Sequence, residues 1–326
     1  MFPPSFLKRL FGARRNGARH HGAHLDRAQR QGGENEPDSA TPWSQSLGSH
    51  LNGSRLIECL SRSPDHKSTL VFLAESPERR RCVAKVRLPE ACPESRRRHE
   101  NEIQALHAIS HPRIPKLLDH GTTNGNASYF VTEFVDAPTL LTIASSSANW
   151  IWQDRLATLH SLANLLSEVH ASGFIHNDLS PENVLVHNQN EPHLLDFGIT
   201  TEIEPTELPR AKITGSPAVI SPEAIRREPT TTRSDIYSLG CLGFLLLNNQ
   251  LPYPGKTPIE ICWKHLNADA ETPLEIEHSE DEILREALRE AHTLVSKCMS
   301  KEASGRPQSA GAVTEALRKI RSRLRT

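Results

Sequence analysis

The chain has 326 residues, of which 37% are hydrophobic and 24% charged, enough for one large globular unit or two lobes plus a tail. The formal net charge is −1, but residues 1–30 carry seven Lys and Arg against Asp26 alone; removing this +6 leaves −7 for the rest. A slightly acidic body argues against nucleic acid as the main partner.

The cysteine pattern indicates a reducing compartment. The six cysteines form no C-x-x-C pair and none lies near histidines at metal-ligand spacing. Isolated thiols of this kind are typical of a cytoplasmic protein, and we expect that localisation. The longest apolar run, residues 239–247, is interrupted by two glycines. A membrane span needs about 20 apolar residues, so this run predicts a buried helix and no transmembrane segment.

Residues 1–52 are rich in Arg, His, Gly, Gln, Ser and Asn, which predicts a basic, mostly disordered tail. Phe6, Leu7, Leu10 and Phe11 can share one face of a helix whose other face is basic. One interpretation is a weak contact with a membrane surface or a partner through this tail. The other interpretation, which the composition favours, is a solvated basic tail.

Residues 53–135 are predicted to form a small strand-rich lobe. Leu70–Ala74 and Cys82–Val86 are apolar runs flanked by charged turns, and two more such runs flank Asn124-Gly125. Asn-Gly between apolar runs is a strong hairpin signal. Between these pairs of strands, Pro93–Ser110 has a proline in its first turn and apolar residues at helical spacing, which predicts one helix.

Residues 136–326 are predicted to form a larger helical lobe. Leu156–Val169 carries a broad apolar stripe, and two short strands, Asn183–His187 and His193–Asp196, bracket a polar turn. Three later segments have helical periodicity: Ser234–Leu247, Glu280–Ser300 and Ser309–Leu324. The expected fold class is therefore α+β, with a small strand-rich lobe followed by a larger helical one.

Three polar residues at short fixed spacings suggest chemistry. Asn183 lies five residues after Asp178, and Asp196 lies thirteen after Asn183. Phosphoryl transfer from a nucleotide needs one acceptor that orients a hydroxyl and oxygen ligands for a divalent metal ion. Asp178 is the candidate catalytic base, and Asn183 and Asp196 are the candidate ligands of Mg²⁺. The alternative for each is a helix cap or turn residue.

The runs His176-Asn177-Asp178-Leu179-Ser180-Pro181-Glu182-Asn183 and Asp196-Phe197-Gly198 resemble the catalytic loop and metal-binding loop of the protein kinase family. The similarity covers about residues 54–324 and is closest in kind to compact bacterial-type Ser/Thr kinases. The resemblance implies a two-lobed protein kinase-like fold. It also implies that His176 and Phe197 pack internally.

By the same resemblance, Lys85 in Cys82-Val83-Ala84-Lys85 is expected to pair with Glu102 and hold the nucleotide phosphates, with Glu100 as the fallback partner. The backbone of Glu133 and Val135 is expected to bind the adenine edge. The residues expected to sandwich the adenine faces are Val71, Val83 and Leu185.

Two further matches imply structural support in the larger lobe. Glu223 and Arg306 resemble the family's buried ion pair, and Asp235 resembles the residue that accepts backbone N–H groups of the catalytic loop. These features separate protein kinases from small-molecule phosphotransferases.

The chain also departs from the family pattern. Residues 60–69, where a glycine-rich loop is expected, contain no glycine, which predicts a differently shaped lid over the phosphates. Asn177 replaces an arginine that in many kinases binds a phosphorylated activation segment, so we expect activity that is independent of such phosphorylation. Ser180 replaces a lysine beside the γ-phosphate, which predicts slow transfer.

We therefore expect a Ser/Thr protein kinase that uses ATP and Mg²⁺, with a nucleotide and a protein substrate as its partners. Two alternatives stay open. The lost glycines, Asn177 and Ser180 favour a pseudokinase, a binding module or scaffold on the same fold. A kinase fold that transfers a nucleotidyl group is the other alternative.

Overall fold

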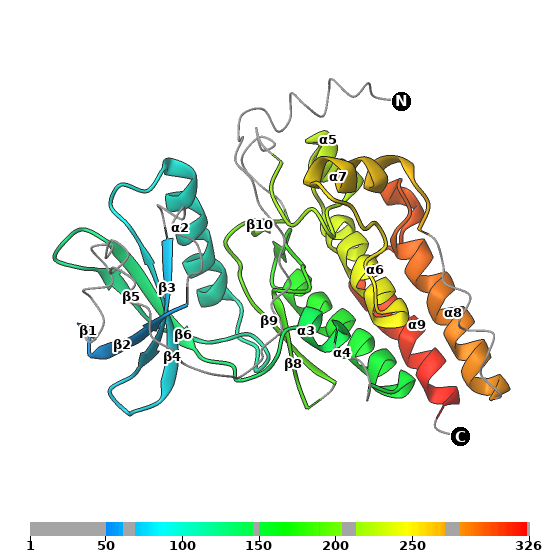
Figure 1. The fold of residues 1–326 in the computed structure, drawn as a ribbon, viewed down its shortest axis with the longest axis horizontal. Coiled ribbons are helices and arrows are strands. Elements are labelled where there is room, and N and C mark those ends of the chain that lie inside the picture. The colour runs from blue at the N-terminus through cyan, green and yellow to red at the C-terminus, as the bar shows by residue number, and fades with distance from the viewer. Residues whose placement is uncertain are drawn as a thin grey trace, which may run out of the picture.

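The structure is a computed structural model that describes residues 50–60, 69–145, 150–188, 190–203, 213–270 and 281–324. The chain folds into two lobes, a strand-rich N-terminal lobe with one helix and a larger helical C-terminal lobe (Figure 1). This is the α+β arrangement expected from the sequence. Most of the expected tail and the segment in place of a glycine-rich loop lie outside the described residues.

The N-terminal lobe is built on a six-stranded antiparallel sheet in the order β1-β2-β3-β4-β6-β5. Its strands are β1 (His50–Leu51), β2 (Ser54–Cys59), β3 (Thr69–Glu75), β4 (Arg81–Arg87), β5 (Leu117–Thr122) and β6 (Ser128–Glu133). The predicted hairpin is confirmed, because Thr123 N–H donates to the Ala127 carbonyl at 2.8 Å and Asn126 takes a left-handed φ of 60°.

Period-two alternation decides which side chains of the sheet face the interlobe site. Phe72, Ala74 and Ala84 are fully buried in the core on one side of the sheet. Val83 and Lys85 alternate with them on β4 and lie on the other face. That face also receives the helix α2 (Pro93–Ala108), since Lys85 contacts a side chain of this helix.

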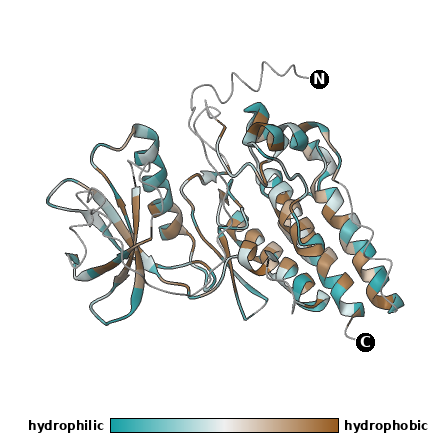
Figure 2. Ribbon diagram, in the orientation of Figure 1, coloured by the Kyte–Doolittle hydropathy of each residue, from teal (hydrophilic) through white to brown (hydrophobic). Residues whose placement is uncertain are grey.

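The larger lobe is a helical layer around α4 (Trp152–Ala171) and α6 (Thr232–Asn248). Figure 2 shows α6 as mainly hydrophobic and α4 as alternately hydrophobic and polar. Gly243 permits the close approach of α6 to its neighbours, because a Cβ there would lie 2.7 Å from Val295 Cγ2. The other helices of this lobe are α3 (Leu140–Ser145), α5 (Pro222–Arg226), α7 (Pro258–Asn267), α8 (Glu282–Cys298), η3 (Ala303–Gly305) and α9 (Ala310–Arg323).

Short strands lie where the two lobes meet. They are β7 (Phe174–Ile175), β8 (Val184–His187), β9 (Glu191–Leu194) and β10 (Thr201–Glu202), with β8 paired to β9 and β7 paired to β10. The expected strand His193–Asp196 is shifted, because Asp196 lies after β9 with a left-handed φ of 60° that no strand residue adopts.

The six cysteines are free thiols, in line with the expectation from their spacing. Across the described ranges, no helix combines the length and the hydrophobicity that crossing a bilayer requires.

Candidate active site

Lys85 stands between two carboxylates at the junction of the lobes. Its Nζ lies 2.5 Å from Glu102 Oε1 on α2 and 3.9 Å from Asp196 Oδ1 in the loop after β9. The Lys85 side chain is 20% exposed and that of Glu102 is 9% exposed, so the pair is mostly withdrawn from water. The structure thus brings Lys85 and Glu102 together with Asp196, which lies more than a hundred positions after Lys85 in the sequence.

One cation between two acids explains the electrostatics of this cluster. Burial alone would lower the pKa of Lys85, but the charges of Asp196 and Glu102 outweigh it and raise that pKa above its ordinary value. The Lys85 charge in turn lowers the pKa of Asp196. Burial raises the pKa of Glu102 to about 7, since Lys85 is shared and Asp196 repels a second negative charge. Lys85 therefore stays charged beside an ionised Asp196.

Asp178 and Asn183 are hydrogen-bonded to each other in the loop between β7 and β8. Asn183 Nδ2 donates to the Asp178 carbonyl at 3.0 Å and to Asp178 Oδ2 at 3.2 Å. Ser216 N–H donates to Asp178 Oδ1 at 2.8 Å. Burial raises the pKa of Asp178, and these donors oppose the shift. A carboxylate held in this way is oriented rather than free to rotate.

The loop that carries Asp178 is anchored to α6 by Asp235. Asp235 is fully buried and accepts the backbone N–H groups of His176 at 2.7 Å and Asn177 at 2.8 Å. His170 Nε2 lies 2.8 Å from the same carboxylate. The structure therefore confirms the contacts expected of Asp235.

His176 connects the catalytic loop to the segment before Asp196. Its Nδ1 accepts Asp178 N–H at 3.2 Å, so Nε2 carries the proton and donates to the Leu195 carbonyl at 3.1 Å. The His176 and Phe197 rings are both fully buried, with centroids 4.8 Å apart. Both residues pack internally, as the sequence predicted.

The backbone at Asp196 is held in a sparsely populated conformation. Asp196 and Asn177 both have positive φ, at 60° and 64°, without being glycine. Such conformations persist only where surrounding contacts hold them, and they concentrate at functional sites. Gly198 N–H donates to Asp196 Oδ1 at 3.2 Å, and Leu195 N–H donates to the Asn183 carbonyl at 2.8 Å. These bonds connect the two candidate metal-binding residues through the backbone.

The expected adenine-binding residues surround the connection between the lobes. Val71 and Val83 lie on the face of the sheet that carries Lys85, and Leu185 lies on β8 in the larger lobe. The N–H of Glu133 donates to the Lys116 carbonyl at 3.0 Å. Within the described residues the N–H of Val135 has no acceptor, which leaves a backbone donor at the expected position.

Sequence analysis did not identify the Ser216 backbone N–H, which follows Gly215, as a hydrogen-bond donor to Asp178. Gly215 has a φ of 107°, and a Cβ there would lie 3.1 Å from the Asn177 carbonyl. Only glycine fits this approach comfortably, and the turn delivers Ser216 N–H to Asp178. Gly215 could have indicated an unusual turn at this position. It could not have indicated the donor, because a backbone N–H leaves no side-chain pattern in a sequence.

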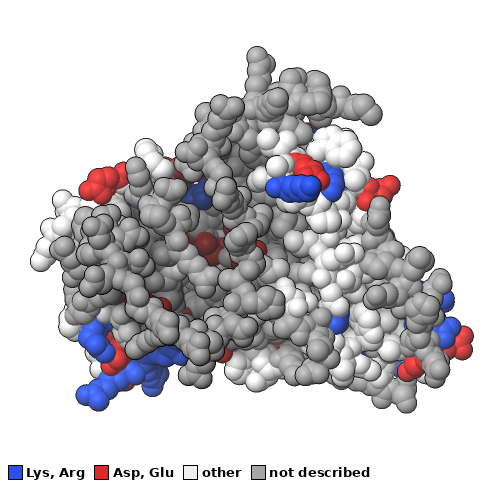
Figure 3. All heavy atoms as spheres, in the orientation of Figure 1, with Lys and Arg blue, Asp and Glu red and all other residues white. Residues whose placement is uncertain are grey.

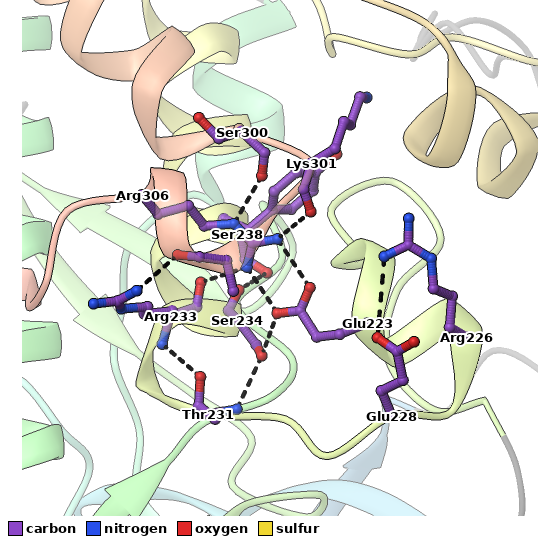
Figure 4. Close-up of polar contacts among 12 residues, drawn as sticks. Glu223, Arg226, Glu228, Thr231, Arg233, Ser234, Ser238, Ser300, Lys301 and Arg306 are labelled. Atoms are coloured by element: carbon purple, nitrogen blue, oxygen red, sulfur yellow. Dashed lines mark hydrogen bonds and ion pairs between the residues drawn. The ribbon is translucent and has the colours of Figure 1, made fainter.

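The segment that follows Ser216 is fixed by a buried ion pair in the larger lobe (Figure 4). Arg306 Nη1 and Nη2 donate to the two carboxylate oxygens of Glu223 at 2.7 and 2.9 Å, and Ser234 Oγ adds a third bond at 2.6 Å. The guanidinium also donates to the backbone carbonyls of Ser300 and Lys301. The ion pair expected from the sequence is therefore confirmed.

The oxygen atoms of Asn183 and Asp196 suit a hard divalent cation. The Asn183 amide nitrogen is used by Asp178, which leaves its carbonyl oxygen as the ligand atom, and Asp196 is ionised. Among the described residues, no group of three or more His, Cys, Asp or Glu forms a metal site. Magnesium at nucleotide sites characteristically uses one or two protein oxygens together with phosphates and water, so the donor set fits it.

Among the described residues in Figure 3, acidic atoms are visible in a recess near the centre of the face, below a basic residue. Most of the other charged residues, of both signs, lie toward the edges. Acidic side chains inside a hollow are suited to a cation brought in with an anionic ligand.

The two lobes, with a Lys–Glu pair on the small one and an Asp–Asn loop on the large one, define a kinase-like class of fold. The family model described as protein kinase domain matches residues 67–318, and the chain belongs to the protein kinase family. Members of this family use ATP and a divalent metal ion.

Several bacterial proteins are similar to this chain. A serine/threonine-protein kinase pkn2 from Myxococcus xanthus is 32% identical over 234 residues, which cover 70% of this chain and 27% of the relative. PknB of Mycolicibacterium smegmatis is 31% identical over 54% of this chain and 29% of its own length, and PrkC of Bacillus subtilis is 30% identical over 54% and 27%. The chain spans less than a third of the length of these relatives.

Proposed function

We propose that this chain is a Ser/Thr protein kinase that transfers the γ-phosphoryl group of ATP to a protein hydroxyl. The observation that supports it most is the position of Lys85, 2.5 Å from Glu102 and 3.9 Å from Asp196. A scaffold has no need of a buried cation shared between two acids at a lobe junction, because such a cluster is expensive to desolvate.

In the proposed reaction, Lys85 neutralises the charge of the nucleotide phosphates while Glu102 holds its amine in place. Asn183 and Asp196 would hold Mg²⁺, which supplies additional positive charge for the phosphates. Val71, Val83 and Leu185 contact the faces of the base, and the backbone of Glu133 and Val135 meets its edge.

Asp178 orients the acceptor hydroxyl. A bond forms between the hydroxyl oxygen and the γ-phosphorus, the bond from that phosphorus to the β–γ bridging oxygen breaks, and ADP leaves. The hydroxyl proton passes to Asp178 and then to solvent. Ser180 is buried and adds no cation beside the transferred group, so we expect modest rates.

The test uses the purified full chain with Mg²⁺, a general protein acceptor and ATP labelled at either the γ- or the α-phosphate. Asp178→Asn and Asp196→Ala are the test variants, and Asp154→Asn at the start of α4 is the matched control. γ-Label on protein that is lost in both test variants and kept in the control supports the proposal. α-Label on protein would indicate nucleotidyl transfer, and no label at all would indicate a scaffold.

A further inference from the structure

The residues directly after Phe197 and Gly198 are held by a side-chain amide of the catalytic loop. Asn177 Nδ2 donates to the Ile199 carbonyl at 3.2 Å and to Thr201 Oγ1 at 2.8 Å. The same nitrogen lies 3.3 Å from the Ile175 carbonyl. One amide thus connects β7, its own loop and the segment that follows the candidate metal-binding loop.

Two more amides reach the same segment from α2. Asn101 Nδ2 donates to the Thr200 carbonyl at 3.4 Å, and Gln104 Nε2 donates to Glu202 Oε1 at 3.3 Å. We name the side chains of Asn101, Gln104 and Asn177 the amide clamp.

The amide clamp joins the two halves of the active site. Asn101 and Gln104 flank Glu102 on α2, and Asn177 directly precedes Asp178. A shift of α2 relative to the catalytic loop would break either the bonds from α2 to residues 200 and 202 or the bonds from Asn177 to residues 199 and 201. The position of Glu102, and through it that of Lys85, is therefore tied to the position of Asp178.

The bonds of the clamp need no phosphate. Its donors are neutral amides, and three of its acceptors, the carbonyls of Ile175, Ile199 and Thr200, are backbone groups that do not titrate. The Thr201 hydroxyl is already used as an acceptor, and Thr201 is paired with Ile175 in the β7–β10 ladder. A phosphate on this hydroxyl would displace the bond instead of strengthening it.

We propose that the amide clamp is the positioning device of this active site, setting α2 against the catalytic loop without a phosphorylated residue. Asn101, Gln104 and Asn177 are positioning residues, since none of them meets the reacting atoms. The inference rests on the proposed kinase function and names how that site is kept assembled.

The pair Gln104–Glu202 allows a reversible test. Gln104→Glu places two carboxylates together, and we expect kcat to fall about tenfold with the KM for the protein acceptor unchanged. The double variant Gln104→Glu/Glu202→Gln restores the bond with donor and acceptor exchanged, and we expect kcat to return to within about twofold of the original.

A matched control exists on α4. Asn164 Nδ2 donates to Glu168 Oε1 at 2.7 Å, an exposed amide–carboxylate pair away from the site. Asn164→Asp introduces the same repulsion there, and kcat is expected to stay within about twofold. An equal loss in Asn164→Asp and Gln104→Glu, or no recovery in the double variant, would overturn the positioning role.

Hydrogen exchange tests the clamp independently of catalysis. Amide protection over residues 199–203 is expected to fall in Gln104→Glu and in Asn177→Ala, and to return in the double variant. If the unmodified protein transfers no phosphate, the proposed function fails while the exchange result still decides the clamp. If it does transfer phosphate but exchange and kcat are unchanged in Gln104→Glu, the clamp alone is wrong.

A separate measurement tests whether the active site is assembled without a phosphorylated residue. Protein freed of phosphate by a phosphatase, and verified by mass spectrometry, is expected to keep its initial rate within about twofold. A loss of more than tenfold would mean that a phosphorylated residue assembles the site.

Discussion

Two Lys/Arg–Glu ion pairs among the described residues, Glu223–Arg306 and Lys85–Glu102, differ in how completely the protein satisfies them. In the large lobe, the Arg306 side chain is fully buried and binds both oxygens of Glu223. In the small lobe, Lys85 has one close contact with Glu102 and a second acid at 3.9 Å, and its side chain is 20% exposed. We call Glu223–Arg306 the closed pair, because protein groups alone satisfy both of its charges. We call Lys85–Glu102 the open pair, because the Lys85 amine can still bind an anionic ligand.

The surroundings of the two ion pairs also differ, since one pair lies in a rigid part of the protein and the other depends on the position of a single helix. The large-lobe pair lies against the start of the buried helix α6, through the bond from Ser234 to Glu223, and α6 also anchors the catalytic loop through Asp235. The small-lobe pair depends on the position of α2, whose polar face is held by the long amide bonds of Asn101 and Gln104. The large lobe therefore supplies a fixed frame, and the small lobe supplies the part whose position can change.

Removing one partner of the closed pair is expected to have the largest effect on stability. Glu223→Ala leaves the Arg306 guanidinium buried and unpaired, and this group cannot lose its proton. We expect the free energy of unfolding to fall by about 3–5 kcal/mol. Urea unfolding at neutral pH measures the change.

The control for this experiment is Glu315→Ala on α9, which removes the partner of the exposed Arg318. Exposed pairs contribute little because water and salt screen them, so no measurable loss is expected. Equal unfolding midpoints for Glu223→Ala and the original protein would contradict the contrast between the two pairs.

Removing the cation of the open pair is expected to affect activity more than stability. Lys85→Met leaves Glu102, but burial already raises the pKa of this carboxyl to about 7, so it can take up a proton. We expect kcat to fall about 100- to 1,000-fold, as for the loss of one preorganised charge beside the phosphates. The loss of unfolding free energy is expected to be smaller than in Glu223→Ala.

Lys297→Met on α8 is the matched control, because Lys297 is exposed and α8 lies on the side of the larger lobe away from the small lobe (Figure 1). Initial rates and urea unfolding on the same preparations separate the two effects. A Lys85→Met protein that keeps most of its rate would remove Lys85 from the proposed mechanism.

Much of the fold could be predicted because its signals are local. Alternation in β3 and β4, the Asn124-Gly125 turn and Pro93 at the start of α2 each act over a few residues. The two-residue pairing of β7 with β10 had no such signal, because its strands are too short for a pattern and lie far apart in sequence.

The residues of the candidate site also fall into those that local sequence signals could predict and those that they could not. The spacing of Asp178, Asn183 and Asp196 was visible because the loops that hold them are short. Asn101 and Gln104 were not visible, since an amide on a helix beside charged residues has the pattern of a solvent-facing position. Their role depends on where the segment after Gly198 lies, which only the tertiary structure determines.

The smallest expected effect is a loss of stability in acid, and it arises from a buried histidine in the larger lobe. His292 on α8 is buried, its Nε2 has no hydrogen-bond partner in the described residues, and burial lowers its pKa to about 4. The unfolded chain has an ordinary histidine pKa of about 6.5 and therefore binds more protons between pH 6.5 and 4. Stability is expected to fall as pH decreases through this window, by about 1 kcal/mol from His292 at pH 5.5.

His292→Leu removes this proton uptake, so the free energy lost between pH 7.5 and pH 5.5 is expected to shrink by about 1 kcal/mol. His187→Leu, which replaces an exposed histidine on β8, is the matched control, and its loss between the two pH values is expected to equal that of the original protein. Denaturant unfolding at the two pH values gives the comparison for each protein. An identical acid loss in His292→Leu and the original protein would mean that His292 accepts its proton inside the fold, and the helical frame would then be less closed to water than its burial implies.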